Sequence, residues 1–358
     1  MVQTTNQLEW HHRLLVETAI KEDTSPGPNP LVAIYPRYEP PDANKLVRQK
    51  VIESTRQIPT TAGLNSVAGL ADSKEILQEA VYLPLKFPHL FTGGLQPSNK
   101  ILLYGPPGTG KTHLVNAFAA EMNIPLYSIT STDLLSTWLG ESEKLIRELF
   151  EYTREQAEYC FIFIDEVDSI CRQRTARDTE VTRRMKNELL AQMNACNSNT
   201  FLLCATNCPW DIDSAFLRRF QRRIYIPLPG KNDRRDIIKL CLQDTRHELS
   251  DSDWAQLLDL TDGFSGSDLA NLTSCALLKP IRELANSTHW IVNDKNQLTP
   301  CTPLCANAMK CNVHSLPHDK VVARPMNFTD IMLALQTCHR SVNRDDIVKF
   351  ENFTARFG

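Results

Sequence analysis

The sequence predicts an α/β protein, in which helices cover both faces of a parallel sheet, followed by a smaller helical domain. The first observation is a series of short apolar runs without alternation, which is typical of strands buried on both faces. The second is that stretches with helical spacing separate these runs, as in repeated strand–helix–strand units. The third is that the strand-like runs mostly end before residue 230. The expected strands are 101–104, 126–129, 161–164, 201–205 and 224–226, and the helices between them are 112–122, 143–158 and 183–194.

The first 63 residues differ from the rest of the chain. Residues 8–22 have the spacing of a short helix, and the stretch 24–30 that follows is rich in proline. Prolines at that density do not sit inside helices or central strands, so this stretch predicts a linker. Asp42 is a good N-cap, so a second short helix is expected to run from there to about Ser54, before Pro59.

The last third of the chain predicts a helical domain with an irregular interruption. Its expected helices are 233–243, 252–260, 267–286, 328–340 and 344–354. The interruption between 290 and 326 is compatible with short strands or with a loop. The domain organisation we expect is an N-terminal segment and linker helix at 1–63, an α/β domain at 64–229, a helical domain at 230–289, an insert at 290–326, and a return helix with a C-terminal helix at 327–358.

Composition and charge exclude several classes of protein. The chain has 358 residues, 42% of them apolar and 23% charged, and a formal net charge of −3, which is ordinary for a globular protein. A strongly basic, nucleic-acid-coating surface is therefore not expected. No apolar run approaches the roughly 20 residues of a membrane span. The N-terminus has no basic region followed by an apolar stretch, so no secretory signal is expected.

Eleven cysteines are scattered along the chain. The densest group is Cys301, Cys305 and Cys311, with His314 nearby. A zinc site would more usually show paired CxxC motifs or two spaced histidines. We therefore expect reduced thiols rather than a zinc site.

Residues 105–112 fit the pattern GxxxxGK[ST] of a phosphate-binding loop. They follow an expected strand and precede an expected helix, which is the context that gives the pattern its meaning. Glycines let backbone N–H groups turn inward around phosphate oxygens, and the helix N-terminus adds a favourable dipole. The lysine would reach the β- and γ-phosphates, and the threonine would hold Mg²⁺. The candidate phosphate-binding residues are Gly105, Pro106, Pro107, Gly108, Thr109, Gly110, Lys111 and Thr112.

Two acids follow the apolar run 161–164 directly. They are expected at the carboxyl edge of the sheet, where ligands of α/β proteins bind. Asp165 would hold Mg²⁺ through water, and Glu166 would be the general base that polarises the attacking water. Asp168 is better interpreted as a capping or orienting residue.

Polar residues on both sides of the loop between the next two strands suggest further parts of the site. Asn207 follows the run 201–205, where an amide could position the attacking water, although asparagine is common in turns. Residues 218–223 contain four arginines. They predict either a solvated basic face or arginine fingers that stabilise charge on the γ-phosphate of a neighbouring chain.

Together these segments resemble the AAA ATPases, and within that class most closely the vacuolar protein sorting-associated protein 4 family, which disassembles ESCRT-III filaments. The resemblance extends from about residue 64 to the C-terminus. The segments that carry it are 67–91, 101–112, 131–150, 163–170, 183–194, 205–229 and 261–269.

The resemblance implies roles for individual residues. Asn207 matches the sensor asparagine, and Arg218 and Arg219 match the arginine fingers, which act on a neighbour's ATP. Trp138 and Leu139 match the first pore loop, which grips extended polypeptide. Nucleotide contacts outside the phosphate loop are implied for Val67, Ala68, Gly69, Gly266 and Ser267. The implied fold is an AAA large domain with a parallel sheet and a small helical bundle carrying a short β-type insert and a C-terminal helix.

Three segments point to this family within the AAA class. Residues 297–303 and 342–358 resemble the family's β-insert and terminal helix, and 41–54 resembles its linker. The insert argues against the related microtubule-severing enzymes, which lack it. Some features depart from the family pattern: residues before 41 do not resemble its filament-tail-binding (MIT) domain. Asn65 and Ser66 replace the usual Trp/Asp pair, and Thr137 replaces a lysine.

The resemblance implies an ATP-driven, ring-forming remodeller that uses ATP and Mg²⁺ and threads subunits of ESCRT-III-like filaments through a central pore. A homo-oligomer, expected as a hexamer, or a mixed ring is implied, with a cofactor protein on the 290–326 insert. The implied location is cytoplasmic, with peripheral recruitment to endosomal membranes and no specific nucleic acid. The alternatives are a microtubule-severing relative and a regulatory subunit of another AAA ring.

Overall fold

The computed structural model describes residues 55–57, 63–93, 95, 97–130, 141–156, 158–173, 180–197, 199–243, 245–293, 296–305, 307–317 and 319–358. The expected helices at 8–22 and 42–54 lie outside these residues. So do Thr137, Trp138 and Leu139. The described residues belong to one compact unit, 47–358.

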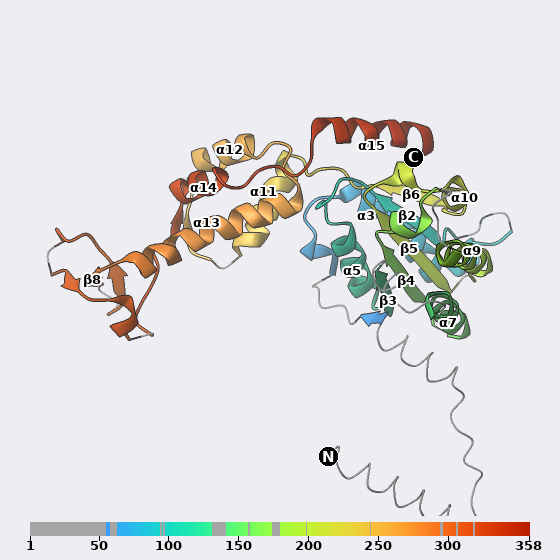
Figure 1. Cartoon of the computed structure of the whole chain (residues 1–358), viewed down its shortest axis with the longest axis horizontal. Helices are drawn as coiled ribbons and strands as arrows, with labels where there is room; N and C mark the ends of the chain where they lie inside the picture. The colour runs from blue at the N-terminus through green and yellow to red at the C-terminus, as the bar shows by residue number, and fades with distance from the viewer. Residues whose placement is uncertain are drawn as a thin grey trace, which may run out of the picture. The chain divides into compact units, whose positions relative to one another are not determined.

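A mixed sheet forms the centre of the large domain (Figure 1). Within the described residues it has six strands in the order β1–β3–β4–β5–β2–β6. The five predicted strands pair in parallel, which confirms the predicted fold class, and the short β1, which the sequence did not predict, pairs antiparallel with β3 at one edge. The strands are β1 (Arg56–Gln57), β2 (Lys100–Tyr104), β3 (Leu126–Thr130), β4 (Cys160–Asp165), β5 (Thr200–Thr206) and β6 (Arg222–Tyr225).

Side chains alternate between the two faces of this sheet, and each face has its own core. Ile101 and Leu103 of β2 pack in a cluster with Phe118 of α5, whereas Leu102 and Tyr104 pack on the opposite side. Both faces are covered, so the strands read as continuous apolar runs. The covering helices are α3 (Ala71–Leu77) and α5 (Lys111–Met122) on one face, and α7 (Glu141–Glu155) and α9 (Glu180–Ala195) on the other. Shorter helices are α4 (Leu83–Lys86), α8 (Asp168–Cys171) and α10 (Ser214–Leu217).

The helical domain follows β6. Its helices are α11 (Lys231–Leu242), α12 (Asp251–Leu260), α13 (Gly266–Asn286) and α14 (Phe328–Leu335). A short parallel pair, β7 (His247–Glu248) with β11 (Met326–Asn327), joins its two halves. The expected helix 328–340 is five residues too long, because the chain leaves the helix after Leu335, buries Cys338 in the domain core and binds Ser341 to Asp268. None of the described helices is long and apolar enough to span a bilayer.

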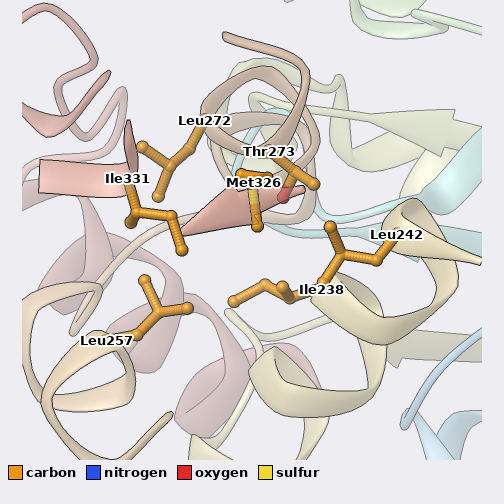
Figure 2. Close-up of a pocket in the computed structure, with 7 residues that line it drawn as sticks. All are labelled: Ile238, Leu242, Leu257, Leu272, Thr273, Met326 and Ile331. Atoms are coloured by element: carbon orange, nitrogen blue, oxygen red, sulfur yellow. The ribbon is translucent and has the colours of Figure 1, made fainter. Parts of the chain in front are cut away.

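The core of the helical domain contains a cavity of about 10 Å³. Figure 2 shows its lining side chains pointing toward one another from α11, α12, α13, β11 and α14. This volume corresponds to about one water molecule, and an apolar site of this kind stays dry. The cavity is therefore a packing gap and not a ligand site. Its lining residues are Ile238, Leu242, Leu257, Leu272, Thr273, Met326 and Ile331.

The insert at 290–326 contains strands as well as loops. A three-stranded sheet in the order β10–β8–β9 begins at the end of α13 (Figure 1). Trp290 is fully buried against Leu298 and Leu316, and its Nε1 donates to the Cys311 carbonyl at 3.0 Å. Trp290 is thus the largest buried side chain in the core of this small sheet. The strands are β8 (His289–Val292), β9 (Leu298–Pro300) and β10 (Met309–Lys310).

The C-terminal helix α15 (Arg344–Phe357) packs on the large domain although it follows the helical domain in sequence. Phe350 is 1% exposed and contacts the rings of Trp210 and Tyr225. Tyr104, the last residue of β2, stacks edge-on against Phe353 and donates to Thr354 Oγ1 at 3.0 Å. The last helix therefore touches the strand end from which the expected phosphate loop begins.

Candidate active site

The expected phosphate loop joins β2 to α5, as the sequence predicts. Lys111, the first residue of α5, is 7% exposed, and its Nζ donates to the carbonyls of Gly105 and Pro106 at 2.9 and 2.8 Å. Burial lowers the pKa of Lys111 to about 8, and the carboxylates of Asp165 and Asp168 partly oppose that shift. A buried ammonium held by neutral carbonyls would be better stabilised by phosphate oxygens, which carry charge.

The two acids lie beside this loop. Thr112 Oγ1 donates to Asp165 Oδ2 at 2.5 Å, and the other Asp165 oxygen accepts from the Glu166 backbone N–H at 2.8 Å. Glu166 has a φ of 49°, in the left-handed region that non-glycine residues seldom adopt. The Val167 N–H is held by the Ala205 carbonyl at 2.9 Å, which fixes the turn after β4. Outliers of this kind often mark active sites.

These oxygens fit Mg²⁺. A threonine hydroxyl and a carboxylate are the hard ligands that this ion prefers, and it usually keeps several waters as well. Their contact shows that the two side chains converge on one point beside Lys111. Elsewhere, within the described ranges, no group of three or more His, Cys, Asp or Glu side chains is placed to hold a metal.

The turns after β4 and β5 are linked by Asp168. Thr206 Oγ1 donates to Asp168 Oδ1 at 2.6 Å and accepts from the Cys208 N–H at 2.9 Å. Asn207 lies between Thr206 and Cys208 in the sequence. Because β5 is between β4 and β2 in the sheet, Asn207 follows the strand that separates the acids from the phosphate loop. Asp168 thus orients Thr206, in the turn that carries Asn207.

The N-terminus of α13 touches the phosphate loop. The Ser267 N–H donates to the Gly108 carbonyl at 3.1 Å, and a Cβ added at Gly266 would lie 3.2 Å from the same oxygen. Asp268, in the same helical turn, accepts from the backbone N–H and the hydroxyl of Ser341. The helical domain and the segment before α15 therefore meet at the nucleotide loop.

A pocket of about 500 Å³ lies between the segment 64–69 and α11. This size is ordinary for a small-molecule site. Val67, Ala68 and Gly69 line it, so the structure places all three beside a pocket. The pocket residues on the α11 side were not predicted from the sequence. They recur at helical spacing on the face opposite Ile238 and Leu242, and this spacing could have indicated that the solvent side of the helix lines a site. They are Asp236, Lys239, Leu240 and Gln243.

The two candidate arginine fingers follow α10 and differ in their surroundings. Arg218 is exposed. Arg219 is half-buried and donates to the Ala215 carbonyl at 2.8 Å and to Asn194 Oδ1 at 3.3 Å. Arg218 is thus the freer of the two to reach another chain.

Comparison with known families defines the class of protein. Residues 101–228 match the family model of the ATPase family associated with various cellular activities (AAA), and residues 298–358 match the Vps4 C terminal oligomerisation domain. The chain is therefore an AAA ATPase with a C-terminal oligomerisation domain.

Individual relatives narrow the class. The chain is 43% identical over 311 residues to vacuolar protein sorting-associated protein 4A of Homo sapiens, covering 82% of this chain and 70% of that protein. It is 38% identical over 358 residues to Protein SUPPRESSOR OF K(+) TRANSPORT GROWTH DEFECT 1 of Arabidopsis thaliana, covering 94% and 82%. The chain belongs to the vacuolar protein sorting-associated protein 4 family.

Two further matches cover less of the chain or are less similar to it in sequence. Spastin of Anopheles gambiae is 40% identical over 249 residues, which cover 68% of this chain and 30% of spastin. Among solved structures, the FIGL-1 AAA domain superposes with a TM-score of 0.72 at 29% identity, covering 93% of this chain and 99% of that one. The AAA architecture is shared, while the 43% identity over 82% of the chain to vacuolar protein sorting-associated protein 4A exceeds the identity of either of these two matches.

Proposed function

We propose that this chain hydrolyses ATP with Mg²⁺ at the site described above and uses the cycle to extract subunits from ESCRT-III-type filaments. The observation that carries the proposal is the convergence of Lys111, Thr112 and Asp165 at one sheet edge, with Glu166 directly beyond. The proposed location is cytoplasmic, with peripheral recruitment to endosomal membranes.

Each residue of the site has a task in this proposal. Lys111 and the loop N–H groups bind the phosphates. Thr112, and Asp165 through water, would hold Mg²⁺, which would neutralise part of the phosphate charge. Glu166 accepts a proton from water as the water oxygen bonds to the γ-phosphorus and the bond to ADP breaks. Asn207 orients this water.

The remaining parts of the site come from other chains and from the pore. Arg218 and Arg219 of a neighbouring subunit stabilise the charge of the transferring phosphoryl group. Trp138 and Leu139, which lie outside the described residues, grip the extended substrate in the pore. The insert at 290–326 offers a surface for a cofactor protein, with Leu304 95% exposed.

The test is to trap partners with a Glu166→Gln chain. The substituted amide keeps the size of the side chain but accepts no proton, so ATP should bind and persist while hydrolysis falls by at least about 100-fold, which is the scale of general-base catalysis. Purification from cytosol with ATP should capture ESCRT-III subunits, identified by mass spectrometry. A Lys111→Ala chain, which cannot hold the phosphates, serves as the control and should capture none.

Other outcomes would redirect the assignment. Capture of tubulin in place of filament subunits would favour the severing alternative. Capture of another AAA chain without any filament protein would indicate a regulatory subunit. Full turnover by the Glu166→Gln chain would contradict the role of Glu166 as the base.

A further inference from the structure

The wall of the 500 Å³ pocket formed by residues 63–69 is held through its backbone. The Leu64 N–H donates to Glu121 Oε2 at 3.3 Å, the Ser66 carbonyl accepts from His113 Nε2 at 3.1 Å, and the Val67 carbonyl accepts from Lys74 Nζ at 2.6 Å. Three side chains from outside the segment thus determine where this wall lies.

Two of those three side chains come from α5, the helix that begins with the phosphate-binding lysine. Gly63 shows how closely α5 approaches the segment: its φ is +70°, and a Cβ added there would lie 2.3 Å from Glu121 Oε2. The left-handed φ favours glycine at this position. The segment is held mainly by α5, since two of its three side-chain contacts come from that helix.

His113 is the link that lies nearest in sequence to the phosphate-binding residues. It follows Lys111 and Thr112 directly, so its backbone position is set by the same turn of helix that binds the phosphates. The His113 residue is exposed, so core packing does not explain its position, whereas the contact with the Ser66 carbonyl does. A ring N–H can donate to this carbonyl whether the imidazole is neutral or charged.

We propose that His113 is a positioning residue for the nucleobase, which fastens the pocket wall 63–69 to the phosphate-binding turn. This inference rests on the proposed function, because it takes the pocket beside Val67, Ala68 and Gly69 as the base-binding half of the nucleotide site. The ligand class is an adenine nucleotide whose phosphates lie on α5 and whose base enters the pocket. His113 acts through the Ser66 carbonyl and does not touch the phosphates.

The proposal predicts that loss of His113 changes the affinity only for ligands that carry a base. A ligand that consists of phosphate alone binds to the loop and Lys111, and its affinity does not depend on the pocket wall. A nucleotide uses both halves and needs the wall in place. Removing His113 should therefore weaken nucleotide binding and leave phosphate binding unchanged.

The experiment is calorimetric titration of the full-length chain with ADP and, separately, with inorganic pyrophosphate, each with Mg²⁺. His113→Ala should weaken ADP binding about fivefold, the usual effect of one neutral hydrogen bond. Its affinity for pyrophosphate should stay within about twofold of the wild-type value. His113→Gln, whose amide N–H can donate to the same carbonyl, should restore ADP binding. His89→Ala, an exposed histidine away from the pocket, is the matched control.

Steady-state hydrolysis provides a second readout. The KM for ATP should rise in His113→Ala with kcat unchanged, and the melting temperature should match the wild type. Equal weakening of ADP and pyrophosphate, or no weakening of ADP, would overturn the role of His113. If the wild-type chain bound ADP no more tightly than pyrophosphate, the pocket would not be a base site, and the proposed nucleotide site itself would fail.

Discussion

At the scale of the residue, the backbone of the phosphate loop constrains its sequence more strongly than its side chains do. A Cβ added at Gly105 would lie 2.1 Å from the Ile226 carbonyl oxygen, a contact that the backbone would have to relieve. A Cβ at Gly108 would lie 2.7 Å from Ser265 Oγ, and the φ of Gly108 is +75°. Gly108 therefore lies close against the N-terminus of α13, to which its carbonyl is bound through the Ser267 N–H.

Gly108 can be tested against a glycine with the same backbone strain. Gly93 has a φ of +69° but no atom within 4 Å of an added Cβ. Both substitutions to alanine carry the left-handed penalty of about 1 kcal/mol. Only Gly108→Ala should also displace Ser265 and the loop, so its ADP affinity should fall at least about tenfold in calorimetry while Gly93→Ala binds normally. Equal affinities in the two variants would show that the α13 contact is unimportant.

The sequence predicted which residues of the site come together, but not how they are held. The loop pattern, the two acids and Asn207 were visible because each follows a buried strand in a regular α/β unit. The fastening of the pocket wall by His113, Glu121 and Lys74 was not, because it depends on contacts between segments that no local pattern records. The side-chain roles remain predictions until the variants are measured.

At the scale of the element, the periodicity of the C-terminal helix predicts that the helix forms but not which domain it packs on. Its helical spacing was clear, and the structure places a helix at Arg344–Phe357. Which domain it packs on is decided by Phe350 and Phe353, whose partners Trp210, Tyr225 and Tyr104 are distant in sequence. The short strands β1 and β8–β10 were missed or left open for the same reason, since two to four residues carry too little pattern.

Removing one ring from this helix should detach it. Phe350→Ala deletes a fully buried aromatic side chain, a change that usually costs about 3–5 kcal/mol in the free energy of unfolding. Val348 lies on the same helix and is 52% exposed, so Val348→Ala should change stability by less than about 0.5 kcal/mol. Urea unfolding measures both, and hydrolysis should fall in Phe350→Ala because the end of β2 loses its support. Similar stabilities for the two variants would contradict the packing described.

At the scale of the whole molecule, the proposed hydrolysis site is divided between neighbouring chains. Lys111, Asp165 and Glu166 are assembled within one chain, while exposed Arg218 follows α10. The match to an oligomerisation domain at 298–358 supports this proposal, since an oligomer brings a neighbour to each site. No pattern in a single sequence specifies the geometry of that neighbour.

Complementation between two inactive chains tests this division. Arg218→Ala keeps its own base but offers no arginine, and Glu166→Gln keeps the arginine but has no base. Mixed rings contain sites in which the Arg218→Ala chain receives Arg218 from a Glu166→Gln neighbour, so mixing should restore ATP hydrolysis measured by phosphate release. Hydrolysis by the Arg218→Ala chain alone should be lower by about 1000-fold or more, the usual scale of an arginine finger. Absence of any recovery on mixing would argue that Arg218 acts within its own chain.

The contact between Tyr104 and Thr354, together with that between Asp268 and Ser341, has a consequence for how the family diverges. Selection on the phosphate loop extends through these contacts to the C-terminal segment of the chain. Substitutions at Ser341, Phe350 and Thr354 should accumulate across lineages as slowly as those at Gly108. Exposed positions of the same helix, such as Val348, are where variation should collect.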